Sequence, residues 1–127
     1  MKQNAIIKTI SIFDIVFRLN NIEVINLADQ ILRKFFLGFI QIHILHHAKK
    51  EPIYGTWMIA ELEEHGYDMS PGTLYPILHS MENKGLLTKE DRNVDGKIRK
   101  YYSITPLGED ILEQAKAKAY ELFKEIK

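Results

Sequence analysis

Two neighbouring segments, Ser70–Leu87 and Lys97–Thr105, carry the side chains of this chain that are best suited to binding another molecule. The first combines apolar residues at helical spacing with hydroxyl, aromatic and imidazole groups on the opposite face. The second is basic and follows a tight-turn signal, which predicts the returning strand of a hairpin. Hydroxyl and ring groups can contact base edges, and cations can contact phosphates. A helix followed by a basic ribbon therefore predicts a winged helix-turn-helix, which places that helix in the major groove of DNA.

The segment after Ser70 has clear helix start and stop signals. Ser70 can cap the helix through its hydroxyl, and Pro71 suits the first helical position because its missing N–H is not needed there. Gly85 is a C-terminal stop after Lys84. Pro76 removes one helical hydrogen bond, and it either only bends the helix or sets its docking angle. The predicted inner face consists of Leu74, Ile77, Leu78 and Met81, and the predicted outer face of Thr73, Tyr75, Pro76, His79, Ser80 and Lys84.

A basic hairpin is predicted to follow this helix. Residues 86–92 read as a strand, Asp95-Gly96 as the turn, and residues 97–104 as the returning strand. The segment from Lys84 to Tyr101 holds six basic and three acidic residues, although 17 basic and 17 acidic residues cancel over the whole chain. This surplus suits phosphate contacts and equally suits ordinary solvated charge. Tyr101 and Tyr102 fall on opposite faces of the strand, and we expect one of them to be purely structural.

His43 and His47 have the four-residue spacing of a two-histidine metal site, and His46 lies beside them. No glutamate stands between them in an HExxH pattern, and no third ligand is evident in the sequence. A helix C-terminus also favours histidine through the helix dipole. The sequence therefore predicts no metal site and no other cofactor.

The sequence gives little support to an enzyme. It contains no glycine-rich phosphate loop, no nucleophile elbow and no cysteine. Its other candidate carboxylates are predicted on surfaces and turns, where solvation is the default. The single tryptophan, Trp57, and several phenylalanines could line a pocket for a small molecule, but a packing role is the more common outcome. The pocket candidates among the phenylalanines are Phe13, Phe17, Phe35, Phe36 and Phe39.

The length of 127 residues predicts one DNA-binding domain with a helix or two left over for partner contacts. No apolar run approaches the ~18 residues that a membrane-spanning helix needs. The absence of cysteine fits a reducing compartment, so we expect a cytoplasmic protein without membrane contacts.

The remaining elements are predicted from helical spacing and caps. Residues 5–28 are apolar and read as helix or, because many are β-branched, as strand; they must pack on their own domain or on a neighbouring subunit. Asp29 is expected to cap a helix that runs to Ala48. A short helix is expected from Tyr54 to His65, and Thr105-Pro106 opens the last helix.

The last helix carries an apolar stripe that resembles a coiled-coil seam. The stripe packs either on its own domain or on a second copy, and the terminal position of the helix favours a dimer. Its residues are Leu112, Ala115, Ala119, Leu122 and Ile126. The predicted fold is mainly α with a small β-hairpin wing (α+β), in which residues 1–30 form an N-terminal dimerisation segment, 31–104 the DNA-binding domain, and 105–127 a C-terminal dimerisation helix.

Several motifs together resemble the PadR family of transcription regulators over the region from Phe35 to the C-terminus. The most specific is Ser70-Pro71-Gly72-Thr73-Leu74-Tyr75-Pro76, with Arg99-Lys100-Tyr101-Tyr102 following at the usual distance. The other matching motifs are Tyr54-Gly55, Lys84-Gly85-Leu86-Leu87 and Thr105-Pro106-Leu107-Gly108. The resemblance implies a homodimeric repressor that binds an inverted-repeat operator in double-stranded DNA and is released by a small-molecule effector.

The resemblance also implies roles for individual residues. Those expected to face DNA are Ser70, Gly72, Thr73, Tyr75 and His79; Tyr54 and Gly55 are expected to approach a phosphate. Lys97, Arg99 and Lys100 would serve the wing, while Lys84 and the helix start at Ser70 and Pro71 would add phosphate contacts. The alternative is a winged-helix module that binds proteins and has no specific affinity for DNA.

Overall fold

The computed structural model describes the backbone of residues 21–127 and the side chains from residue 26 onward. The chain divides between Leu37 and Gly38 into two compact units, and helix α2 (Asn21–Lys50) contributes to both. The predicted segment 5–28 lies largely outside the described residues; from Asn21 onward it is helical. The predicted cap at Asp29 is wrong, because Asp29 lies inside α2. Its carboxylate accepts from Arg33 Nε at 2.7 Å, an i,i+4 pair that suits a helix interior.

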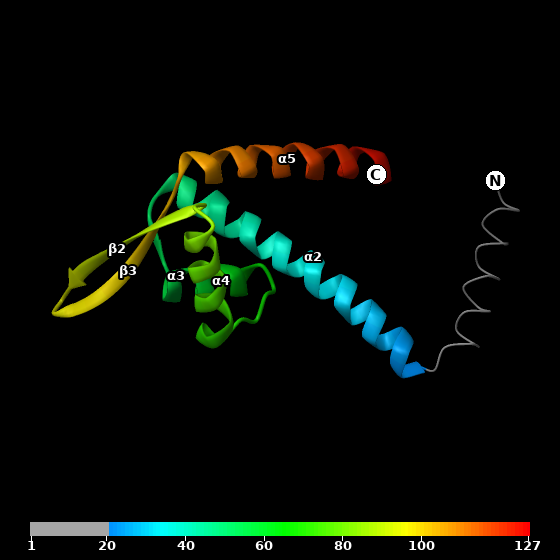
Figure 1. Cartoon of the computed structure of the whole chain (residues 1–127), viewed down its shortest axis with the longest axis horizontal. Coiled ribbons are helices and arrows are strands. Elements are labelled where there is room, and N and C mark those ends of the chain that lie inside the picture. The colour runs from blue at the N-terminus through cyan, green and yellow to red at the C-terminus, as the bar shows by residue number, and fades with distance from the viewer. Residues whose placement is uncertain (1–20) are drawn as a thin grey trace, which may run out of the picture. The chain divides into compact units, whose positions relative to one another are not determined.

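The second unit, residues 38–127, holds a three-stranded antiparallel sheet in the order β1–β3–β2. Its strands β2 and β3 form a long hairpin (Figure 1). Strand β2 spans Leu87–Val94, and β3 spans Lys97–Ile104. Asp95 and Gly96 join them with φ angles of 54° and 83°, as a two-residue type I′ turn requires. The predicted hairpin is therefore confirmed. The two-residue strand β1 (Ile53–Tyr54), which pairs with β3, was not expected, because the sequence suggested that a helix begins at Tyr54.

Two helices lie between β1 and β2: α3 (Gly55–Glu64) and α4 (Pro71–Asn83). The start of α4 at Ser70-Pro71 is confirmed in position, but the Ser70 hydroxyl does not cap the helix. Ser70 Oγ instead lies 3.2 Å from Thr73 Oγ1, so the two hydroxyls satisfy each other. The end of α4 follows the prediction: Gly85 has a φ of 79°, and Leu86 N–H donates to Met81 O at 2.9 Å.

Every described element of this unit contributes to one apolar core. The helices α2, α3 and α4 supply most of it, and the sheet adds Ile53, Leu87 and Tyr102. The core residues are Ile40, Ile44, Leu45, Ala48, Ile53, Met58, Leu62, Leu74, Leu78, Met81, Leu87, Tyr102 and Leu112. Tyr102 is buried while Tyr101 is not, so the expectation that one of the two tyrosines is structural is confirmed.

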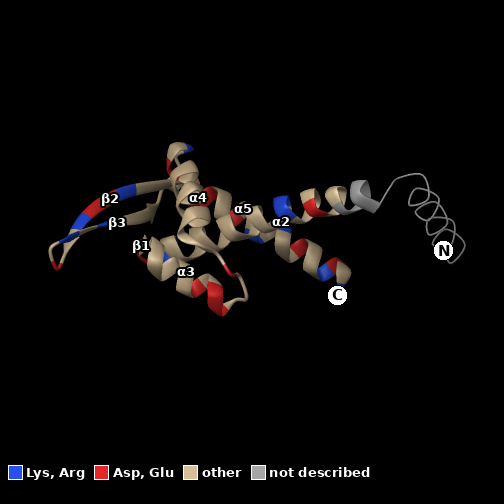
Figure 2. Cartoon of the chain, turned by 90° about the horizontal axis from the view of Figure 1, so that it is seen from below, with Lys and Arg blue, Asp and Glu red and all other residues tan. Residues whose placement is uncertain are grey.

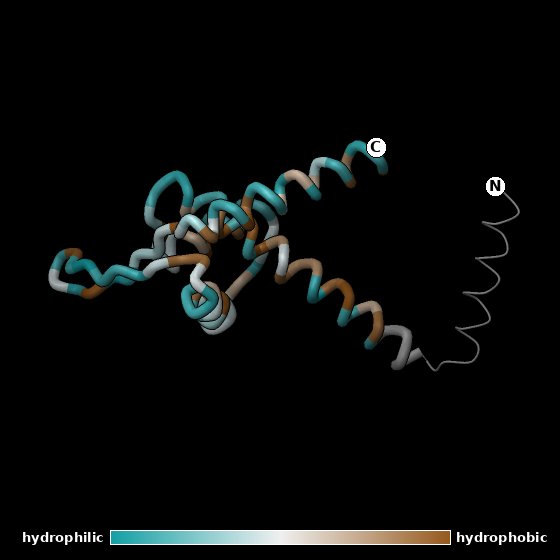
Figure 3. Tube along the Cα trace, turned by 45° about the horizontal axis from the view of Figure 1, so that its top comes forward, coloured by the Kyte–Doolittle hydropathy of each residue, from teal (hydrophilic) through white to brown (hydrophobic). Residues whose placement is uncertain are grey.

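The last helix, α5 (Pro106–Ile126), begins as predicted at Thr105-Pro106. Thr105 Oγ1 accepts from Gly108 N–H at 3.0 Å and donates to Gly85 O, which ties the start of α5 to the end of α4. Leu112 anchors α5 in the core, and beyond it the helix is exposed. In Figure 3 apolar residues recur among polar ones along this exposed part. Within residues 21–127, no helix is both long enough and apolar enough to span a bilayer.

Candidate nucleic-acid interface

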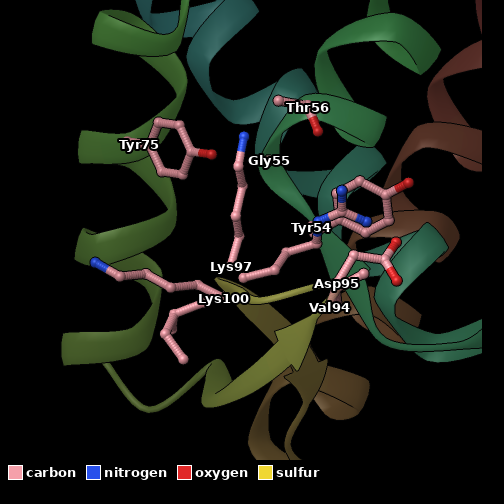
Figure 4. Close-up of a pocket in the computed structure, with 10 residues that line it drawn as sticks. Tyr54, Gly55, Thr56, Tyr75, Val94, Asp95, Lys97 and Lys100 are labelled. Carbon is pink, nitrogen blue, oxygen red and sulfur yellow. The ribbon is translucent and has the colours of Figure 1, made fainter.

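An open cleft of about 730 Å³ lies where the hairpin meets the starts of α3 and α4. The residues lining it come from β1, α3, α4 and the hairpin: Tyr54, Gly55, Thr56, Tyr75, Val94, Asp95, Lys97, Ile98, Arg99 and Lys100. Figure 4 shows the Tyr75 hydroxyl directed toward the start of α3, with Lys97 between the Tyr75 ring and Tyr54. The cleft therefore combines three cations with two phenols on an exposed side of the unit.

Two arginines and two tyrosines are stacked along the hairpin, where Arg92 and Arg99 form the third cross-strand pair back from the turn. The Arg99 guanidinium lies over the Tyr54 ring at 4.1 Å, and that of Arg92 over the Tyr101 ring at 4.3 Å. The two tyrosine rings are 5.3 Å apart, because β1 pairs Tyr54 with Tyr101. A hydrogen bond with the Tyr101 side chain is the main reason that the pKa of Arg99 is raised, so Arg99 stays charged. The tyrosine rings therefore hold the two positive guanidiniums close together, and their charge is not fully neutralised by a neighbouring anion.

Arg92 is absent from the predicted DNA-binding residues, and the structure shows why it belongs near them. It lies directly opposite Arg99 in the β2–β3 ladder. Its own carboxylate partner is Glu90 Oε2 at 3.2 Å, an exposed pair of small energetic weight. Counting cross-strand partners back from the Asp95-Gly96 turn would have found it. Figure 2 shows the basic and acidic segments that follow each other along the hairpin.

Tyr75 is held in the cleft by its contact with Gly55. Gly55 is buried, and a Cβ built on it would come within 2.8 Å of Tyr75 Cε1. The missing side chain of Gly55 therefore lets the Tyr75 ring pack against the start of α3. Tyr75 remains 38% exposed, so its ring edge and hydroxyl stay accessible. This packing role of Gly55 was not anticipated from the sequence, which suggested only an approach of its backbone to phosphate.

The predicted DNA-binding residues fall into two groups. Tyr54, Gly55, Tyr75, Lys97, Arg99 and Lys100 line the cleft. The others are exposed along or beside α4, outside the cleft lining: Ser70, Pro71, Gly72, Thr73, His79 and Lys84. Within the second group His79 has only a distant partner, Glu82 Oε1 at 3.9 Å from Nδ1. Together they form a polar strip that leads from the start of α4 toward the hairpin.

A second, mainly apolar cavity of about 200 Å³ lies between α2 and α5. Its lining consists of Phe39, Ile42, His43, His46, Leu112 and Lys116. Phe39 is thus a pocket residue as well as a packing residue. Trp57 packs against the core, as the sequence favoured, and its ring lies 5.3 Å from that of His47.

Two of the histidines of α2 lie beside a histidine from another helix. His43 and His47 share a face with His65 from the end of α3, and their ligand atoms all lie within 4.8 Å of one another. His46 points elsewhere and is exposed. The third histidine that the sequence did not reveal is therefore present, since α2 packs beside the end of α3.

Comparison with known proteins gives one consistent result. The sequence model described as "Transcriptional regulator PadR-like family" matches residues 44–114. The transcriptional regulator Rv3488 of Mycobacterium tuberculosis is 44% identical over 95 residues, covering 75% of this chain and 89% of that protein. The structure of a PadR-like transcription factor from Bacteroides fragilis is similar with a TM-score of 0.68 and 32% identity, covering 76% of this chain and 95% of that one. A PadR family regulator from Eggerthella lenta gives a TM-score of 0.66 at 28% identity, covering 83% and 93%.

Proposed function

This chain belongs to the PadR-like family of transcriptional regulators, and we propose that it acts as a homodimeric, sequence-specific repressor that binds double-stranded DNA. Its relatives are regulators rather than enzymes, and its fold is the mainly helical winged helix with a small β wing. The operator of such a dimer would be an inverted repeat, because a two-fold protein presents two identical helices to DNA.

The observation that carries this proposal is the cation-lined cleft beside α4. Arg92 and Arg99 stand on tyrosine rings, and Lys97 and Lys100 lie beside them. Each stacked guanidinium has five N–H donors, of which its contact with Glu90 or Tyr101 uses only some, and the others can donate to phosphate oxygens. We propose that a DNA phosphate lies against this stack while the hairpin follows the backbone.

Helix α4 would then lie in the major groove. Thr73 and Tyr75 are exposed on its outer face and can contact base edges or thymine methyl groups. At the helix start Gly72 N–H can donate to a phosphate, whereas Pro71 has no N–H and the N–H groups of Thr73 and Leu74 donate to Ser70 O. Lys84 and His79, further along α4, would contact the backbone on the far side.

The dimer would form through α5 and the N-terminal part of the chain. Exposed apolar residues continue along α5 after Ala115, and Leu122 and Ile126 are 55% and 71% exposed. Burying such a surface against a second copy removes apolar area from water at about 25 cal/mol per Å². Residues 1–30 are proposed to add to the same interface, and residues 31–104 to form the DNA-binding domain. A small-molecule effector would use the apolar cavity beside α5, enlarged by the partner subunit.

Fluorescence anisotropy with labelled DNA from the regulator's own upstream region tests the proposal, at low and at high salt. A regulator should outcompete random DNA, and the logarithm of its affinity should fall steeply with the logarithm of salt. Weak binding that is equal for both DNAs would contradict sequence specificity. An absence of binding at low salt would favour the protein-interaction module instead.

A further inference from the structure

Two packed helices each present a pair of metal-ligating side chains four residues apart. On α2 the pair is His43 and His47, and at the end of α3 it is Glu61 and His65. Residues four apart lie on the same face of a helix, so each pair points one way. Metal sites in helical proteins are commonly built from such facing pairs. The three histidine ligand atoms lie within 4.8 Å of one another.

The carboxylate of Glu61 lies beside two of the three histidines, at distances longer than an ordinary hydrogen bond. Glu61 Oε1 lies 3.4 Å from His47 Nε2 and 3.5 Å from His65 Nε2. An N–H···O hydrogen bond normally spans about 2.7–3.2 Å. Two ligand atoms bound to one tetrahedral zinc ion, each about 2.0–2.1 Å from it, lie about 3.3 Å apart. The histidine ligand atoms lie within 4.8 Å of one another, so they must come closer together to share one ion, and the half-exposed side chain of His65 can rotate toward the others.

The site is partly enclosed. The side chains of His43 and His47 are half-buried. Aromatic rings lie on two sides, since Tyr67 lies 5.8 Å from His43 and Trp57 lies 5.3 Å from His47. Imidazoles beside one carboxylate form a ligand set that suits zinc and similar divalent ions.

From this geometry we propose that His43, His47, His65 and Glu61 bind one divalent transition-metal ion of the zinc class. The ion would join the end of α3 to α2, directly before the loop that leads into α4. Of the three histidines His65 is the most exposed, so the protein would close the site by moving that side chain. This metal site does not depend on DNA binding, and a measurement of metal affinity alone tests it.

Zinc titration of the full chain against a competing chromophore tests this inference, with Trp57 fluorescence as a second signal. One zinc ion per chain should bind at micromolar or lower concentration, and Trp57 should report it because it contacts His47. His65→Gln should weaken binding by at least about 10-fold, since even outer groups around metal ligands commonly contribute that much. His65 is exposed, so this variant should keep its fold, which circular dichroism checks.

The chain has 5 histidines, and the two outside the cluster provide matched controls. His46→Gln and His79→Gln should each bind zinc like the unchanged protein. An absence of zinc uptake at micromolar concentration would overturn the proposal. So would an equal loss of affinity in His79→Gln and His65→Gln, because that result would mean scattered surface binding. Glu61→Gln should also weaken binding, and an unchanged affinity would remove the carboxylate from the ligand set.

Discussion

The hairpin cleft and the exposed end of α5 are both accessible surfaces, yet they are built by opposite means. In the cleft, cations are stacked on tyrosine rings, and Arg99 lies 4.1 Å above Tyr54. On α5, apolar side chains such as Leu122 and Phe123 are 55% and 58% exposed among surface charges. The first surface suits a polyanion, and the second suits another apolar surface. We therefore propose that DNA binding and dimer formation use separate surfaces of the same unit. Variants of each surface test this separation.

The largest expected effect is on assembly. Leu122→Asp should convert the proposed dimer to monomers, because each copy would lose about 1.5–3 kcal/mol of side-chain burial and gain a charge at the proposed interface. Counted over both copies, this is about 3 kcal/mol or more, or at least about 100-fold in the dimer dissociation constant. Sedimentation velocity measures it. Lys118→Ala, which removes only an exposed ion pair with Glu121, should leave the dimer intact. A dimer in Leu122→Asp would refute the proposed seam.

The next effect should appear only in DNA binding. Arg99→Ala combined with Lys100→Ala removes two proposed phosphate contacts. Each contact contributes about 0.9 to the salt slope, or about 10-fold in affinity at 0.1 M salt, so the pair should cost about 100-fold. Anisotropy titrations at several salt concentrations measure both quantities. An unchanged slope would exclude the wing from the phosphate contacts, and a change in oligomeric state would break the separation of the two surfaces.

A smaller effect concerns the support beneath the cleft. Gly55→Ala should force the Tyr75 ring to move and destabilise the fold by about 1–3 kcal/mol, as overpacking does. Urea unfolding measures this change. Gly38→Ala is the matched control, because nothing lies within 4 Å of a Cβ there, and it should be neutral or stabilising by up to about 1 kcal/mol. Equal behaviour of the two variants would mean that Tyr75 does not depend on Gly55.

The smallest effect concerns the ion pair that holds α5 to α2. Lys49 Nζ donates to Glu113 Oε1 at 3.3 Å, and this hydrogen bond is the main reason that the pKa of Glu113 is lowered. A carboxyl group with a lowered pKa stabilises the fold at neutral pH, and this contribution disappears as the pH falls through the lowered pKa. Because the pair is exposed, Glu113→Gln should reduce thermal stability only slightly at pH 7 and not at all in strong acid. A difference that grows on acidification would contradict this assignment.

Features set by neighbouring residues could be read from the sequence. The Asp95-Gly96 turn and the Thr105-Pro106 helix start follow from local backbone preferences, and both form as expected. The start of α4 at Pro71 also follows from its own residues. Such signals identified the winged helix because α4, the β2–β3 hairpin and the start of α5 each carry a strong local marker.

Features that depend on distant residues could not be read in this way. Strand β1 is only two residues long, and it forms because β3 offers Tyr101 and Tyr102 as partners. His65 joins His43 only through the packing of α3 on α2. Asp29 looked like a cap, but a helix-interior aspartate with Arg33 one turn later has the same local pattern. In each of these cases the local sequence allowed more than one structure, and contacts with spatial neighbours decide which one forms.

The exposure of the hairpin has a consequence for how this regulator can evolve. Along β2 only Leu87 is buried, and the next six residues, to Asn93, are exposed. Substitutions in that stretch change the surface that we propose contacts DNA phosphates while leaving the core untouched, and most surface changes alter stability by less than about 0.5 kcal/mol. The strength of these proposed contacts can therefore change at the wing without compensating mutations elsewhere. Duplicated copies of such a gene would be free to diverge in DNA affinity long before they diverge in their fold.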